Sequence, residues 1–217
     1  MSRSRLAATV VVVVVVVLLG FALDVGVGAV AQSPAPETAP APGKTEQAAE
    51  AQIAAVRGMI VDALWVKTDE YWHSGEIPPV VGICQDLVRL DPHFAEAYSA
   101  GAWIATSVGR EKEAVELYRQ GIALNPDNWD LPHQFGYTYY WTYKHDLESA
   151  LPYLKRAAEL DSPVRIKRSY AHALARAGKP HEAAAEWRKI LQIEPNERVA
   201  LRELKKLRDA GKIGAEE

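Results

Sequence analysis

The chain has 217 residues, of which 48% are hydrophobic and 24% charged, a composition typical of a folded domain and not of a disordered chain. Its net charge is −3 and it shows no basic stripe, so we expect no nucleic acid among its ligands. The single cysteine, Cys84, cannot form an internal disulfide, and we expect it to be a small buried side chain.

Residues 1–31 have the features of an export or anchoring segment. Arg3 and Arg5 precede an uncharged apolar run, residues 6–23, that is long enough as a helix to cross a bilayer core. Two interpretations stay open: a retained transmembrane anchor, or a signal peptide cleaved after Ala31. Basic residues before such a run direct the following chain outward. Both interpretations therefore place the main domain outside the cytoplasm, either anchored to the membrane by one helix or secreted or periplasmic.

The segment from 32 to 44 is rich in proline and alanine. It lacks apolar side chains that could pack, and its four spaced prolines favour an extended, disordered linker. Residues 45–58 are rich in alanine, and we expect them to form a helical lead-in that runs into the next helix.

A recurring proline marks the ends of successive helical patterns. Pro92, Pro126 and Pro195 each follow a similar phrase of an aliphatic and a polar residue, and Pro92 and Pro126 are 34 residues apart. Proline cannot continue a helix and disfavours helix at the residue before it. The spacing thus predicts paired helices at 59–74 and 78–90, 94–108 and 111–124, 129–142 and 147–160, and 164–177 and 181–193. A helix at 197–209 carries one apolar stripe and one charged face, which is typical of a terminal capping helix.

This period, together with glycine and alanine at regular offsets such as Gly109 and Ala114, resembles the tetratricopeptide repeat (TPR) family. The resemblance covers roughly residues 59–209 and leans toward bacterial members. It implies an all-α, right-handed superhelix of about four helical hairpins plus a cap, with a domain spanning 59–211 and a disordered tail at 212–217. The repeats are expected at about 59–92, 93–126, 127–162 and 163–196. The third repeat is irregular, because two extra residues lie near 143–146.

Sequence motifs of the common catalytic, phosphate-binding and metal-binding types are missing from the chain. No HExxH, GxxxxGK[ST], GxGxxG or GxSxG pattern occurs, and the six histidines show no metal-ligand spacing. We therefore expect a protein that is not an enzyme, with no catalytic residues, no metal site and no cofactor.

The TPR resemblance implies a binding groove lined by the first helix of each pair. Carried onto this chain, the groove positions hold the following residues: Trp65, Asp69, Trp72, His73, Trp103, His133, Tyr137, Tyr140, Trp141, Arg165, Arg168, His172 and Arg176. Aromatic and arginine side chains dominate binding energetics, and here acids lie nearer the first repeat and arginines in the fourth. The lysine and asparagine with which family members hold a C-terminal carboxylate are replaced by Trp65 and Asp69, so that mode of binding is not expected.

Three hypotheses about function follow. The first is a non-catalytic scaffold, exported or tethered to a membrane, that binds a protein or peptide in the groove during assembly of a cell-envelope or secretion complex. The second is an enzyme or accessory subunit that binds a glycan or other small ligand on the aromatic groove. The third is self-association, with the Ala-rich helix of one copy filling the groove of another.

Overall fold

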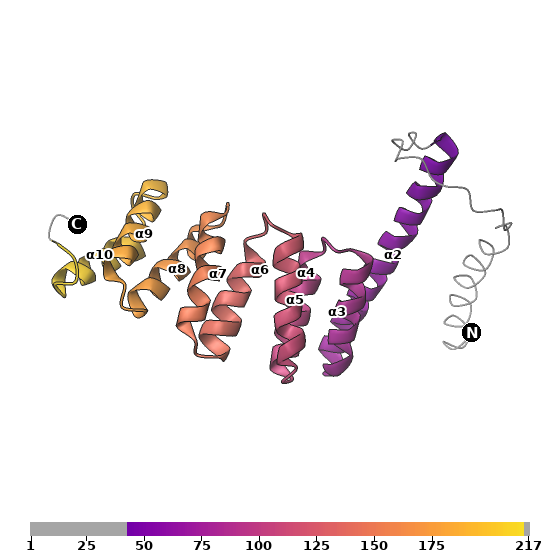
Figure 1. The fold of residues 1–217 in the computed structure, drawn as a ribbon, viewed down its shortest axis with the longest axis horizontal. Coiled ribbons are helices and arrows are strands. Elements are labelled where there is room, and N and C mark those ends of the chain that lie inside the picture. The colour runs from indigo at the N-terminus through magenta and orange to yellow at the C-terminus, as the bar shows by residue number, and fades with distance from the viewer. Residues whose placement is uncertain (1–42, 215–217) are drawn as a thin grey trace, which may run out of the picture. The chain divides into compact units, whose positions relative to one another are not determined.

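A computed structural model of the protein describes residues 43–214, and all regular elements within that range are helical (Figure 1). The predicted export segment at 1–31 and most of the predicted linker at 32–44 lie outside the described residues. None of the described helices is long and apolar enough to span a membrane.

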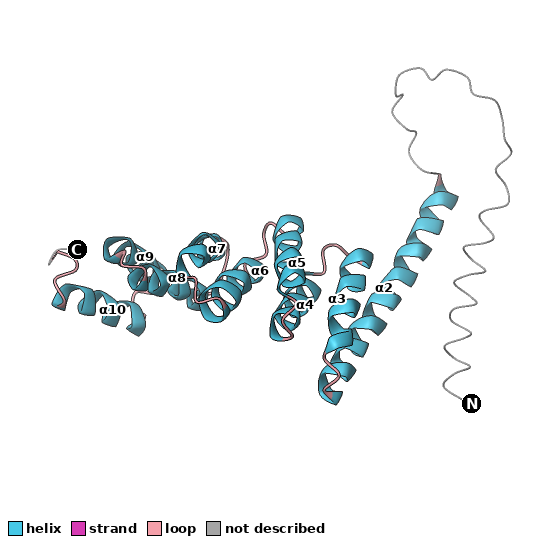
Figure 2. Ribbon diagram, turned by 60° about the horizontal axis from the view of Figure 1, so that its bottom comes forward, coloured by secondary structure: helices cyan, strands magenta, loops and turns pink. Residues whose placement is uncertain are grey.

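The described helices follow one another as hairpins joined by short loops (Figure 2). In chain order they are α2 (Lys44–Ser74), α3 (Pro78–Leu90), α4 (Ala95–Ser107), α5 (Glu111–Leu124), α6 (Asp130–His133), η1 (Gln134–Tyr143), α7 (Leu147–Glu159), α8 (Val164–Arg176), α9 (Pro180–Ile193) and α10 (Arg198–Asp209). From α3 onward, except for the α6–η1 segment, each predicted helix is confirmed to within one residue at both ends.

The turns inside the hairpins need a residue with positive φ. Gly75, Gly109 and Gly178 occupy this place at φ 77°, 77° and 74°, as expected for a residue without a Cβ atom. In the third hairpin the turn between η1 and α7 contains no glycine, and His145 adopts φ 55° instead. The irregular third repeat therefore places an ordinary side chain in a left-handed conformation, which carries a steric cost.

The core forms separate buried clusters between neighbouring helices, as expected for a protein whose repeats contact mainly the next repeat. Cys84 is fully buried with Val80 and Val81 of α3 against Ile104 of α4, which confirms its predicted role as a small core residue. Burial raises the pKa of its thiol to about 12, so Cys84 is not a reactive nucleophile.

The third repeat departs from the prediction of an α-helix at 129–142. Only Asp130–His133 is α-helical, and Gln134–Tyr143 forms a π-helix. The Lys144 N–H donates to the Tyr139 carbonyl at 2.9 Å, five residues earlier, which is the π-helical spacing. Because each wider turn takes up additional chain, the π-helix absorbs the extra residues of this repeat while Phe135 and Tyr139 stay in the core.

Both ends of the described region extend the repeats. The Ala-rich lead-in and the first repeat helix are one continuous helix, α2, as the sequence predicted. The prediction that disorder begins at residue 212 is wrong, because Ile213 is buried against the α8–α10 cluster. Gly211 (φ 63°) turns the chain back after α10, and the Lys212 N–H donates to the Leu207 carbonyl at 3.0 Å.

Candidate functional site

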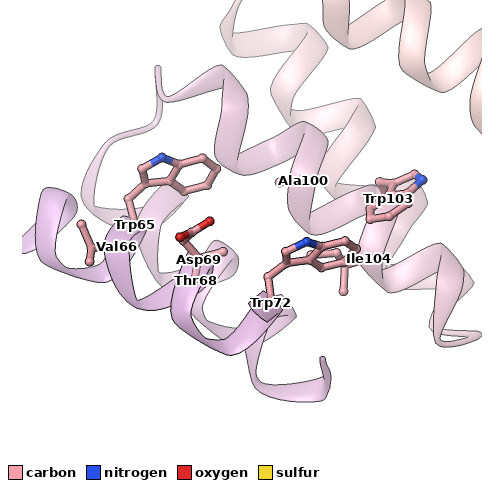
Figure 3. Close-up of a pocket in the computed structure, with 8 residues that line it drawn as sticks. All are labelled: Trp65, Val66, Thr68, Asp69, Trp72, Ala100, Trp103 and Ile104. Atoms are coloured by element: carbon pink, nitrogen blue, oxygen red, sulfur yellow. The ribbon is translucent and has the colours of Figure 1, made fainter. Parts of the chain in front are cut away.

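Three tryptophans from α2 and α4 surround a pocket of about 440 Å³, which we call the tryptophan pocket. Trp65, Asp69 and Trp72 follow one another at spacings of four and three on α2, so they share one face of that helix. Trp103 of α4 meets Trp72 with ring centroids 5.3 Å apart. Figure 3 shows the Asp69 carboxylate between the rings of Trp65 and Trp72.

The tryptophan pocket is acidic as well as aromatic. The Asp69 side chain is largely exposed, and its Oδ1 lies 3.4 Å from His73 Nδ1. A neighbouring hollow of about 400 Å³ shares Trp65 and Trp103 with this pocket and adds Glu96 of α4. Exposed tryptophan faces beside carboxylates attract cations, because the ring quadrupole and the charges act in the same direction.

Arginines from α8 and α10 surround a second pocket of about 530 Å³, which we call the arginine pocket. Its lining residues are Tyr137 and Trp141 of η1, Arg165, Arg168, Ser169, His172 and Arg176 of α8, and Val199 and Arg202 of α10. The α8 residues recur every three or four positions, which gathers them on one helix face. The Arg176 guanidinium lies 5.6 Å from the Trp141 ring centroid, and Arg168 Nη1 donates to Glu197 Oε1 at 2.9 Å.

The charge of the arginine pocket comes from its arginines and not from the nearby histidines. Burial lowers the pKa of His172, whose ring packs edge-on against Trp187 with centroids 4.8 Å apart. Burial, with a further contribution from Arg165, lowers the pKa of His133 to about 4. Both imidazoles are therefore neutral at pH 7, whereas the guanidinium groups stay charged.

Both pockets lie largely on first helices of the hairpins, α2 and α4 for one and η1 and α8 for the other. The hollow next to the tryptophan pocket reaches Gln134 at the start of η1, one helical turn before Tyr137 of the arginine pocket. Between them, His133 stacks on Tyr137 with centroids 5.4 Å apart, and its Nε2 lies 3.3 Å from Ser169 Oγ. We call the surface that holds both pockets and the hollow the groove. It is acidic and tryptophan-rich at one end and basic at the other.

Most of the predicted groove residues are brought together. Trp65, Asp69, Trp72 and Trp103 line the tryptophan pocket, and Tyr137, Trp141, Arg165, Arg168, His172 and Arg176 line the arginine pocket. His133 lies beside the arginine pocket, and His73 lies at the end of α2, outside both pocket linings.

Tyr140 belongs to the core and not to the groove. Its ring stacks on Tyr153 at 5.6 Å and meets Phe135 at 4.8 Å, and it packs against the two largest buried clusters. Its assignment to the groove was wrong because a π-helical segment does not present side chains at the α-helical angles from which groove positions are carried over.

The sequence did not predict that α10 and Glu96 of α4 would line the groove. Arg202 and Val199 of α10 line the arginine pocket, and Glu96 lines the hollow beside the tryptophan pocket. The charged face of the capping helix was visible in the sequence, but its position over the fourth hairpin was not. Within residues 43–214, no group of three or more histidine, cysteine or acidic side chains is placed to hold a metal ion.

No protein-family model and no curated protein matches the chain. Solved structures share its all-α TPR fold, which confirms the predicted fold class. PilF of Pseudomonas aeruginosa is 21% identical with a TM-score of 0.53, over 72% of this chain and 71% of its own. A MamA protein is 16% identical with a TM-score of 0.53, over 70% of this chain and 86% of its own. PilW is 18% identical with a TM-score of 0.50, over 70% of both chains.

Proposed function

We propose that this protein is a non-catalytic adaptor that binds an extended segment of another protein along the groove. The observation that carries the proposal is the opposite character of the two pockets, acidic and tryptophan-rich in one and basic in the other. An extended peptide with a cationic side chain toward one end and carboxylates toward the other fits this arrangement in one direction only.

The chemistry of each pocket supports this ligand. Tryptophan faces beside Asp69 and Glu96 favour a lysine or arginine side chain by cation–π and ionic attraction. Arg165 and Arg176 lie against tryptophan rings, at 5.2 and 5.6 Å, and form no ion pair within residues 43–214. Their guanidinium groups are held in place by stacking while their N–H donors remain able to take a carboxylate in a bidentate pair.

The test compares two peptides of identical composition. One carries lysines at one end and glutamates at the other, and the second has its lysines and glutamates interleaved along the chain. We expect isothermal titration calorimetry to give a dissociation constant about tenfold or more higher for the interleaved peptide, since in either orientation it sets like charges against both pockets. Equal affinity for the two peptides, or no binding of either, contradicts the proposal.

Variants assign the binding to the groove. We expect Trp103→Ala to weaken the preferred peptide by about tenfold or more, because exposed aromatic anchors dominate such interfaces. Tyr143→Ala is the matched control, since Tyr143 is exposed to the same 42% as Trp103 but lines neither pocket. An equal loss in both variants would show that the effect is not specific to the groove. An uncharged oligosaccharide that binds with unchanged affinity in Arg176→Ala would instead favour a glycan ligand on the aromatic residues.

We also propose that the adaptor acts outside the cytoplasm, in assembly of a cell-envelope or secretion complex. The pattern of residues 1–31 supports export, and the structurally similar PilW is described as a widely conserved type IV pilus biogenesis factor. Mass spectrometry of the chain from fractionated cells tests this. Cleavage before Gln32, or an intact chain in the membrane fraction, supports export. An intact chain in the soluble cytoplasmic fraction overturns it.

A further inference from the structure

The N-terminal half of α2 presents an apolar surface that the repeats do not cover. Figure 1 shows α2 continuing well beyond the end of α3. Every residue from 43 to 60 is exposed, and these residues include large apolar side chains: Ile53, Val56 and Met59 are 59%, 55% and 71% exposed. Isolated exposed aliphatics are ordinary, but a contiguous row on one helix marks an interaction surface.

The row has the spacing of a two-helix seam. Its members, in steps of four, three and four, are Ala49, Ile53, Val56 and Ile60. This alternation is the pattern by which two helices interlock. The row lies N-terminal to the part of α2 that packs on the repeats, where Val61 is the first described residue in contact with a buried cluster.

We infer that this segment pairs antiparallel with the same segment of a second copy of the chain. Glu50 and Arg57 flank one side of the seam, seven residues apart, and form no ion pair within residues 43–214. An antiparallel pair sets Glu50 of each copy near Arg57 of the other, so a two-fold axis makes both ion pairs at once. In the same antiparallel pair, Ile53 of one copy lies opposite Val56 of the other, and Ala49 lies opposite Ile60. A parallel pair brings Glu50 and Arg57 opposite uncharged residues instead.

Other occupants fit this surface less well. A helix that lies on a membrane carries several lysines or arginines on its polar face, whereas residues 44–60 hold two basic and two acidic residues. The groove of another copy is mainly aromatic and charged, and its few aliphatic side chains, Val66, Ile104 and Val199, are divided between the two pockets.

The pairing is weak and reversible. The free segment is about 25 Å long, so its interface falls at the small end of specific contacts, and we expect a dissociation constant on the order of 10–1000 µM. Because the C-terminal half of α2 is docked on the first repeat, helix nucleation is already supplied, and the second copy meets a formed helix.

Disulfide trapping of the full-length chain in mild detergent tests the inference. Cys84 is fully buried, so a cysteine introduced at 49 or 60 is the accessible thiol. We expect mixed Ala49→Cys and Ile60→Cys chains to form a cross-linked dimer on oxidation, whereas each variant alone forms little. In the antiparallel pair, two copies of residue 60 lie about 16 Å apart along the axis, beyond the reach of a disulfide.

Charge swaps separate this pairing from a non-specific collision. Glu50→Arg, introduced into both cysteine variants, is expected to lower the yield of mixed dimer several-fold, and adding Arg57→Glu is expected to restore it. Strong cross-linking of each single variant alone, a yield that Glu50→Arg leaves unchanged, or a monomer at millimolar concentration by sedimentation would each overturn the inference.

Discussion

Gly101 of α4 lies against Cys84 of α3, at the contact between the first two hairpins. A Cβ atom at this position would come within 2.7 Å of the Cβ of Cys84 and 3.2 Å of a Leu117 methyl. Both neighbours are buried, so neither can swing into solvent. Gly82 of α3 offers the matched comparison, because it is also inside a helix but a Cβ there meets nothing within 4 Å.

The same substitution should therefore have opposite effects at the two sites. Replacing glycine by alanine inside a helix stabilises by about 0.5–1 kcal/mol, which is the expected result for Gly82→Ala. At Gly101 this gain opposes an overpacking cost of about 1–3 kcal/mol, and a contact of 2.7 Å places it toward the upper end. We expect Gly101→Ala to lower the free energy of unfolding by about 1–2 kcal/mol, a difference of about 2–3 kcal/mol between the variants.

Urea unfolding followed by helical circular dichroism measures this difference. Because the contact is with the Cβ of Cys84, adding Cys84→Ala should not rescue Gly101→Ala, since alanine keeps that atom. If Gly101→Ala were as stable as Gly82→Ala, the close approach of α3 and α4 would be refuted, and the small residues of this repeat would have no packing role.

Two further predictions concern the fourth hairpin and the groove. Glu197 caps α10 by accepting a hydrogen bond from the Ala200 N–H at 2.6 Å, and it also forms an ion pair with Arg168. Glu197→Ala should therefore lower the free energy of unfolding by about 1–2 kcal/mol and speed amide hydrogen exchange in α10. Unchanged protection of the α10 amides would contradict this prediction. Folding lowers the pKa of His133 from 6.5 to about 4. Between pH 6.5 and pH 4 the unfolded chain therefore binds more protons than the folded chain, so the stability that is present above pH 6.5 is lost as the pH falls toward 4. The wild-type chain should lose about 2 kcal/mol more than His133→Gln between pH 7 and pH 5 in urea unfolding, and identical losses would show that His133 is not buried in its neutral form.

The helix boundaries could be predicted because their causes are local. A proline such as Pro92 or Pro126 ends a helix through its own ring, and Gly109 turns the chain through its own missing Cβ, whatever the neighbours are. The π-helix could not be predicted in this way. The sequence shows extra residues in the third repeat, but whether they lengthen the loop or widen the helix depends on how the aromatic side chains pack.

The groove shows the same division. Tyr140 and Trp141 are neighbours of similar character, yet Tyr140 packs into the core against Tyr153 while Trp141 lines the arginine pocket. Adjacent positions on a helix point about 100° apart, so the two rings must face different ways, but which of them faces the core is set by the packing of η1 against α7. Arg202 joined the site for a similar reason, since the packing of α10 over the fourth hairpin decides which of its charges face the groove.

Periodicity, proline and glycine act over a few residues, so the class of fold and the helix ends can be predicted without knowing how the helices pack. Helix packing, in contrast, sets which rings are core and which are free, gathers acids and arginines at opposite ends of the groove, and leaves half of α2 uncovered. Those properties depend on the angles and distances between helices, which are set by the packing of side chains far apart in the chain.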